Sequence, residues 1–348
     1  MQKRNFSILD GLRGICALVV VFYHIETAQY SKYAIFGSGY LAVDLFFLMS
    51  GFVIAHAYEG RLLRGMKISN FISNRAIRLY PTYMLSTFIG LALAVLASFL
   101  AGDAERMDEA FISLPFALLA IPHLSTDGLT WFPLAPPAWS LFYEVILNVV
   151  YAMLVRHLPV QRLAFLSASS LILLGMYVTY NGSVDGAGAI RSVFGISSGV
   201  LLYRIWNAGY FRDKQYPIHL PLILTLLALL LPSEGGWGTV TIPLCLGIVF
   251  PGIILLSVQR EPSQRSVEVF EYLGAISYPI YLLHWPILLA VRKAATISHI
   301  SLVQQVILTM SATIVISAIA LKFYDEPLRK ILTNRKKNKG AVRVTTLS

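Results

Sequence analysis

Long apolar segments separated by short polar connections dominate the pattern of this chain. Ten segments have the length of a membrane-spanning helix, which needs about 20 mainly apolar residues. They are 8–29, 38–58, 79–101, 136–156, 163–181, 187–205, 217–233, 237–257, 272–291 and 301–323. The seventh is the weakest, because only fourteen residues separate His219 from Glu234 and two of them are prolines. We expect it to be a short tilted helix, or half of a re-entrant pair with the eighth.

The composition identifies the solvent of this protein as a lipid bilayer. Of 348 residues, 56% are hydrophobic and 13% are charged, whereas a soluble domain has about 25% charged residues. This excludes a soluble enzyme, a nucleic-acid-binding protein and a disordered protein. Cys16 and Cys245 lie in apolar segments, where small buried hydrophobic residues are expected, and no disulfide or metal site is predicted. We predict an all-α integral membrane protein with about ten transmembrane helices.

The basic residues indicate the orientation of the helices. Ten alternating spans place 22 of the 28 Lys and Arg residues on one side, and the acidic loop 102–135 on the other. By the positive-inside rule both termini are predicted to be cytoplasmic. We expect the first apolar segment to be a retained helix, since Asp10 and Arg13 interrupt it and a cleavage site is lacking. Residues 1–330 then form the membrane domain, and 331–348 a basic cytoplasmic tail that lies loosely against anionic headgroups.

Two ionisable residues share one face of the first span. Charged side chains within a span are expensive and face the protein interior or a water-filled cavity. Arg13 and His24 are eleven residues apart, so they differ by about 20° after three turns and by about 16 Å along the axis. Asp10 lies on the same stripe. The alternative is that Arg13 extends to the headgroups and His24 is a satisfied core residue.

The second span carries an acidic residue at a depth similar to that of His24. A pair between Asp44 and His24 would fix the tautomer of the imidazole and raise its basicity. The alternative is a structural polar contact between helices.

The fourth span begins with prolines and then presents polar residues on one face, Ser140, Glu144 and Asn148, at i, i+4 and i+8. A carboxylate beside a histidine suits acid–base chemistry. The alternative for Glu144 is an ion pair with Arg191 of the sixth span.

Two further groups of side chains are candidates for binding. Arg75 and Arg78 lie at the cytoplasmic start of the third span, where an arginine pair can hold phosphate or simply anchor the helix. The ninth span presents Ser277, Tyr281 and His284 on one face, near prolines that favour kinks. These three side chains either contact a substrate or form polar contacts around irregular backbone.

Five segments, in this order, resemble the integral membrane acyltransferase-3 family over about residues 5–330. They are LDGLRGICALVVVFYH, GYLAVDLFFLMSGFVI, FISNRAIRLYPTY, PAWSLFYE and ISYPIYLLHWP. Arg-x10-His falls at Arg13 and His24, Arg-x2-Arg at Arg75 and Arg78, and WSLxxE at Trp139–Glu144. The resemblance is to stand-alone members, such as polysaccharide and O-antigen O-acetyltransferases.

The resemblance implies an enzyme of the bacterial cytoplasmic (inner) membrane. Such enzymes move an acyl group, usually acetyl, from cytoplasmic acyl-CoA to a hydroxyl of an envelope or exported carbohydrate, including exopolysaccharide and lipopolysaccharide O-antigen. No metal and no nucleic acid is implied. Whether the acceptor is lipid-linked, and whether the acyl group is acetyl or longer, stays open.

The resemblance and the pattern together suggest roles. Arg75, Arg78 and Arg13 would hold the CoA phosphates, and His24, oriented by Asp44 or Glu144, would be the general base. Direct transfer and a covalent acyl-histidine are both open. The expected substrate-binding residues are Ser140, Asn148, Ser277, Tyr281 and His284.

The rival interpretation is a multispan transporter or flippase, for which mid-membrane charges and kinked helices are also typical. CoA binding distinguishes the two, because an acyltransferase binds CoA and a transporter does not. A purely structural scaffold would have no reason to keep such charges in lipid.

Overall fold

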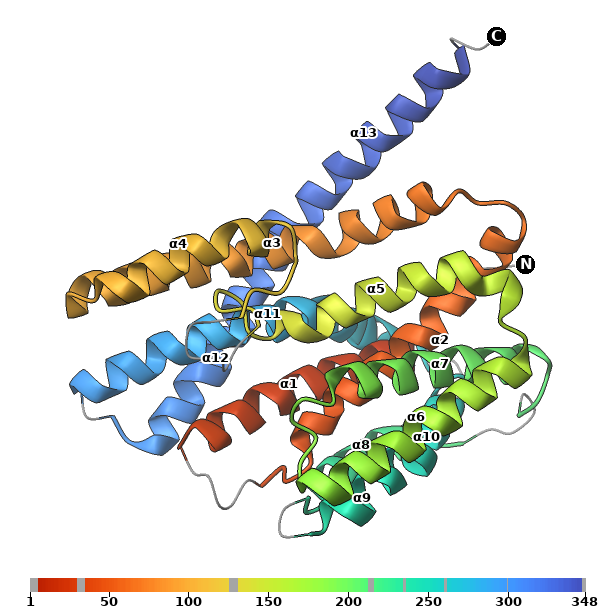
Figure 1. Ribbon diagram of the computed structural model, residues 1–348, viewed down its shortest axis with the longest axis horizontal. Coiled ribbons are helices and arrows are strands. Elements are labelled where there is room, and N and C mark those ends of the chain that lie inside the picture. Colours follow the sequence, from red (N-terminus) through yellow and green to blue (C-terminus); the bar gives the residue numbers. More distant parts are fainter. Residues whose placement is uncertain are drawn as a thin grey trace. The chain divides into compact units, whose positions relative to one another are not determined.

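A computed structural model describes residues 6–29, 35–124, 131–211, 216–233, 236–259, 262–298 and 300–345. In these ranges every regular element is a helix (Figure 1). Helices satisfy their backbone hydrogen bonds internally, which a bilayer demands of any segment that spans it. The predicted all-α class is confirmed for this part of the chain.

The helices follow one another with short connections. In chain order they are α1 (Ser7–Gln29), η1 (Gly39–Leu41), α2 (Ala42–Leu63), α3 (Ile68–Ala101), α4 (Ala104–Leu118), α5 (Ala138–Leu154), η2 (Val155–His157), α6 (Val160–Asn181), α7 (Gly188–Asn207), α8 (His219–Leu230), α9 (Gly238–Leu244), η3 (Cys245–Val249), α10 (Phe250–Ser257), α11 (Gln264–Ser298), α12 (Leu302–Ala320), η4 (Leu321–Asp325) and α13 (Glu326–Thr345). The elements η3 and η4 are π-helical turns.

Each of the ten predicted spans contains a helix. Within the described residues, eight helices are long and apolar enough to cross a membrane. The helix α7 is not among those eight, and α8 has 12 residues, or about 18 Å against a hydrocarbon core of about 30 Å. The seventh span does hold a short helix, as either expectation requires. Whether it crosses or forms half of a re-entrant pair, the count of ten crossings and the side of the termini stay predictions.

The structure is helical at several places outside the predicted spans. The helix α3 begins at Ile68 instead of residue 79, which places Arg75 and Arg78 within it. The helix α13 continues to Thr345 where a loose tail was expected. The expected outer loop contains α4, which is capped by Asp103. Hydropathy marks the length of a helix that lipid surrounds, and charged residues such as Lys and Arg are good helix formers outside it.

The chain forms two compact units. The first consists of Met1–Ile68 and Trp139–Ser277, and the second of Ser69–Ala138 and Tyr278–Ser348. The helix α11 belongs to both, because the division falls between Ser277 and Tyr278 within it. Each unit is described by itself below.

Glycines bring α2 and α7 into backbone contact in the first unit. A Cβ atom on Gly199 would lie 2.2 Å from the carbonyl oxygen of Leu48, and one on Gly51 would lie 2.3 Å from that of Ile196. Small residues allow this approach between membrane helices. The contact brings the polar residues of α2 and α7 face to face.

In the second unit α3 is held by hydrogen bonds from several neighbours. Tyr83 donates to the carbonyl of Ala117 at 2.7 Å, and α4 lies along the second half of α3 (Figure 1). Ser86 donates to the carbonyl of Leu282 in α11 at 2.8 Å. The helix that carries the arginine pair is therefore fixed against both α4 and α11.

Candidate active site

The helix α1 carries Arg13 and His24 without interruption. Their eleven-residue spacing therefore places them on one face, about 16 Å apart along the axis, as predicted. Arg13 forms an ion pair with Asp10 one turn earlier, at 3.5 Å. The arginine is thus held at one end of the stripe, and the imidazole lies three turns further along it.

The partner that the structure gives to Asp44 is Arg191. The carboxylate is fully buried and accepts two parallel hydrogen bonds, 2.9 Å from Nε and 2.5 Å from the terminal nitrogen. Arg191 also donates to the carbonyl of Tyr40, and its guanidinium lies 5.7 Å from the ring centre of Tyr40 and 5.6 Å from that of Trp139. Such a fork and its aromatic surroundings are a strong way of holding a buried charge.

This pair changes the expected roles of two carboxylates. Asp44 was expected to pair with His24, and the structure compensates its charge with Arg191 instead. Arg191 was weighed as the partner of Glu144, and it lies against Asp44. The reason is the glycine contact between α2 and α7, which the sequence of either helix alone does not reveal. A role of Asp44 in orienting His24 stays a prediction.

The predicted polar face of α5 lies on a continuous helix, Ala138–Leu154. Glu144 accepts a hydrogen bond from Ser50 of α2 at 2.7 Å. Ser140 and Asn148 are buried. Both amide atoms of Asn148 are buried and have no hydrogen-bond partner among the described residues, which makes this side chain the least satisfied of the predicted site residues.

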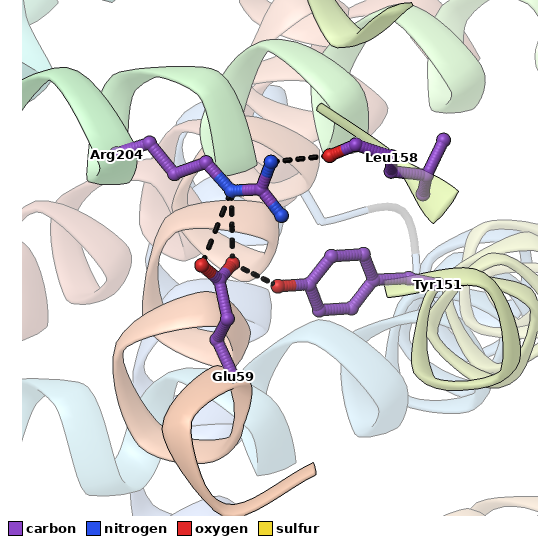
Figure 2. Close-up of polar contacts among 4 residues, drawn as sticks. All are labelled: Glu59, Tyr151, Leu158 and Arg204. Carbon is purple, nitrogen blue, oxygen red and sulfur yellow. Dashed lines mark hydrogen bonds and ion pairs between the residues drawn. The ribbon is translucent and has the colours of Figure 1, made fainter. Parts of the chain in front are cut away.

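A second ion pair ties the ends of α2, α5 and α7 together (Figure 2). The Nε atom of Arg204 lies 3.1 Å from both carboxylate oxygens of Glu59. Tyr151 donates its hydroxyl to the same carboxylate, and Arg204 also donates to the carbonyl of Leu158. Sequence reasoning counted Arg204 only as a loop charge and did not consider Glu59; two opposite charges at span ends on the same side were the available signal.

In the second unit the arginine pair is accompanied by a buried acid. Asp325, the last residue of η4, is 2% exposed and accepts a hydrogen bond from Thr82 of α3 at 2.9 Å. Arg329 of α13 forms an ion pair with it. Arg78 is close enough for its charge to act on the same carboxylate. Neither Asp325 nor Arg329 is among the site residues that the sequence predicts.

The three polar residues of α11 form hydrogen bonds to backbone carbonyls. Ser277 donates to Gly274 at 2.8 Å, and Tyr281 donates to Pro137 at 3.2 Å. His284 is fully buried, and its Nδ1 atom lies 2.7 Å from the carbonyl of Tyr281. Because a carbonyl can only accept, Nδ1 is the donor in this hydrogen bond. These bonds match the alternative of polar contacts within the backbone, and substrate binding stays a prediction.

The predicted site residues divide between the two units. The first unit holds Arg13, His24, Asp44, Ser140, Glu144, Asn148 and Ser277, and the second holds Arg75, Arg78, Tyr281 and His284. Within the described residues, groups of three or more His, Cys, Asp or Glu that could hold a metal ion are absent. The predicted site residues themselves carry imidazole, carboxylate and guanidinium groups, besides hydroxyls and one amide.

The sequence of this chain is similar to that of known proteins. A family model described as an acyltransferase domain matches residues 6–322. "Protein 2 in picA locus" of Rhizobium radiobacter is 38% identical over 161 residues, which cover 42% of this chain and 81% of that protein.

Two longer relatives match over 94% of this chain. The O-acetyltransferase OatA of Staphylococcus aureus (strain NCTC 8325 / PS 47) is 24% identical over 363 residues. The peptidoglycan O-acetyltransferase OatA of Listeria monocytogenes serovar 1/2a is 22% identical over 368 residues. The chain spans 58% and 56% of their respective lengths. No solved structure matches.

Proposed function

The chain belongs to the acyltransferase-3 family, and from this membership we propose that it is a multi-pass membrane O-acetyltransferase. It would move an acetyl group from acetyl-CoA to a hydroxyl of an envelope or exported carbohydrate. The observation that carries the proposal is the alignment of Arg13 and His24 on one face of α1, inside a chain that the family model matches almost throughout.

The donor is proposed from the arginines. CoA carries phosphates at one end and a thioester at the other, so its site needs cations at one end and a base at the other. Arg75 and Arg78 on α3, with Arg13 on α1, supply the cations, since guanidinium groups bind phosphate oxygens in a planar fork. We place CoA entry on the cytoplasmic side, where the basic residues are predicted to lie.

The reaction is proposed as direct transfer. The acceptor hydroxyl oxygen attacks the thioester carbonyl carbon while His24 takes the hydroxyl proton. The carbon–sulfur bond then breaks, and the imidazolium returns the proton to the departing thiolate, so the products are the O-acetyl ester and CoA thiol. Holding both reactants in one site converts a bimolecular step into an effectively unimolecular one.

The acceptor is proposed as a carbohydrate because both OatA relatives are named O-acetyltransferases, and one is named for peptidoglycan. The proposed contacts to the carbohydrate acceptor are Ser140, Asn148, Ser277, Tyr281 and His284. A carbohydrate hydroxyl is a weak acid that is not ionised near neutral pH, so a general base assists its attack.

The test follows radioactive label from acetyl-CoA into the glycan fraction of membranes. Membranes that hold the wild type should transfer base-labile acetyl label, and membranes with His24→Ala should transfer at least about 100-fold less, since general-base catalysis contributes about 10²–10⁴. The matched control is His157→Ala, because His157 is exposed at the end of η2, which follows α5. Equal transfer by His24→Ala and wild type would remove His24 from the chemistry. Absence of transfer and of CoA binding in the wild type would favour a transporter.

A further inference from the structure

A buried carboxylate in the second unit joins two helices that both carry arginines. Asp325 accepts a hydrogen bond from Thr82 of α3 at 2.9 Å and pairs with Arg329, one turn into α13. Arg78 of α3 acts on the same carboxylate through its charge. Asp325 therefore lies between an arginine of the predicted phosphate-binding pair and an arginine from the C-terminal helix.

The charges around this point do not balance. Arg78 and Arg329 bring two positive charges that act on Asp325, and Asp325 is a single buried negative charge. Glu326 also acts on Asp325, but its side chain is exposed, where water and salt screen its charge. The cluster therefore keeps an excess of positive charge that a further anion would compensate.

Arg329 has hydrogen-bonding capacity left after its ion pair. A guanidinium carries five N–H donors, and the pair with Asp325 uses a terminal nitrogen. In the part of the chain that the structure describes, the Nε atom of Arg329 is buried and has no hydrogen-bond partner. A buried donor of this kind is expensive to leave unmet, so a ligand with acceptor oxygens would stabilise it.

The helix α13 is held along the first part of α3. The amino group of Lys336 donates to the carbonyl of Asn70 at 3.0 Å and to the side chain of Asn74 at 2.6 Å. Together with the Thr82–Asp325 bond, this fixes α13 against α3 at two points about three turns apart. The π-helical turn η4 precedes it, and such turns occur frequently at functional sites. Residues 326–338 therefore lie beside the part of α3 that carries Arg75 and Arg78.

We propose that Arg329 is a third phosphate-binding residue of the donor site, with Asp325 and Thr82 as the positioning residues that hold it. This inference rests on the proposed function, in which Arg75 and Arg78 bind the phosphates of CoA. The ligand class is a phosphoester with several anionic oxygens, which three guanidinium groups match in charge and geometry. On this view the first turns of α13 belong to the donor site and are not a lipid-surface tail.

The experiment measures CoA affinity of the purified full-length protein in nanodiscs of phosphatidylcholine, which carry no net charge. The variants are Arg329→Gln and the control Lys330→Gln, which removes the same charge from the next, exposed residue of α13. We expect Arg329→Gln to raise the Kd of CoA about tenfold and Lys330→Gln to change it less than twofold. Arg329→Lys keeps the charge without the fork, and we expect an intermediate loss of affinity, which also covers the case that Arg329→Gln fails to fold.

The positioning role has its own readout. We expect Asp325→Asn to raise the KM for acetyl-CoA several-fold while kcat and the KM for the acceptor stay close to wild type. A general loss of structure would lower kcat and stability together.

The outcomes separate this inference from the proposed function. If the wild type binds CoA and Arg329→Gln binds it equally well, the inference is wrong and the proposed function stands. Lipid retention is measured in parallel on protein purified in detergent from membranes that contain anionic phosphatidylglycerol. If Arg329→Gln keeps CoA affinity but retains less phosphatidylglycerol than the wild type, the cluster binds lipid headgroups and the inference is again wrong. If the wild type does not bind CoA, the proposed function fails and the inference fails with it.

Discussion

At the scale of single residues, the buried pair of Asp44 and Arg191 makes the sharpest statement about stability. Both side chains are almost completely buried, so each charge depends on the other. Asp44→Asn leaves Arg191 without its counter-charge, and breaking a buried pair from one side costs about 3–5 kcal/mol. We expect a marked fall in the apparent melting temperature of the detergent-purified protein.

The control for this prediction removes both charges. In Asp44→Leu/Arg191→Met neither charge is left alone, and apolar replacement of a whole buried pair is often neutral or stabilising. The double variant should therefore melt above Asp44→Asn. If it melts lower still, the two residues contribute independently and the pair is not the reason for the loss.

Asn148 gives the opposite prediction, a gain in stability. Its amide is buried and both polar atoms lack a partner in the described residues, and unmet groups of this kind cost about 1–3 kcal/mol. Asn148→Leu should raise the melting temperature and, if Asn148 contacts a substrate as the sequence predicts, lower acetyl transfer. Asn181→Leu, at an exposed position near the end of α6, should give no gain. A fall in melting temperature of Asn148→Leu would show that the amide is satisfied in the folded protein.

Residue positions along a helix could be predicted from the sequence, and residue partners could not. The 20° offset of Arg13 and His24 and the common face of Ser140, Glu144 and Asn148 follow from helix geometry alone, and α1 and α5 are unbroken over both. Arg191, the partner of Asp44, lies 147 residues away along the chain, and Thr82, which donates to Asp325, lies 243 residues away. Such pairs depend on which helices are neighbours, which one sequence does not state.

At the scale of the elements, the hydropathy pattern located the helices but underestimated several of them. The helix α3 starts at Ile68 with polar residues, and α13 continues well past the apolar end of α12. Both extensions are polar. A hydropathy window detects only the apolar part of a helix, so the predicted span is shorter than the helix. The extensions matter because Arg75, Arg78 and Arg329 all lie on them.

The packing of α2 against α7 predicts that adding a single methyl group at Gly199 lowers the stability of the protein. In Gly199→Ala the new Cβ would meet the backbone oxygen of Leu48 at 2.2 Å, so the two helices must separate. We expect a loss of stability at least as large as that of other overpacked interiors, about 1–3 kcal/mol, measured by thermal unfolding.

The chain offers a matched control for this change. Gly175 lies within α6, and a Cβ there would meet no atom within 4 Å. Gly175→Ala should be neutral or stabilising, because alanine is the better helix former. Equal losses in both variants would mean that the close approach of α2 and α7 is not responsible.

At the scale of the whole molecule, the sequence was sufficient for the class and for the family. An apolar, sparsely charged chain must be helical in lipid, and the quoted motifs agree with a family match over residues 6–322. The number of crossings depends on α7, which carries Arg191 and Arg204 and is not among the eight candidate spans. Charged side chains that face the protein interior lower the mean hydropathy of a helix, although the surface that faces lipid is apolar.

The topology prediction can be tested at the two ends of α7. If α7 crosses the membrane, Asp185→Cys before it should react with an impermeant maleimide from outside, and Tyr210→Cys after it from the cytoplasm. Both positions are exposed. The native residues Cys16 and Cys245 are buried, so they should give little background.

Reference positions fix the two sides in the same experiment. Glu105→Cys on α4 should react from outside, since the loop that contains it is acidic, and Lys337→Cys on α13 should react from the cytoplasm with the other basic residues. The Asp44–Arg191 pair argues for a crossing, because it holds α7 beside the apolar helix α2 at a buried depth. If Asp185→Cys and Tyr210→Cys react from the same side, α7 does not cross. The count of ten would then be wrong, although Glu105→Cys and Lys337→Cys could still place the two faces as predicted.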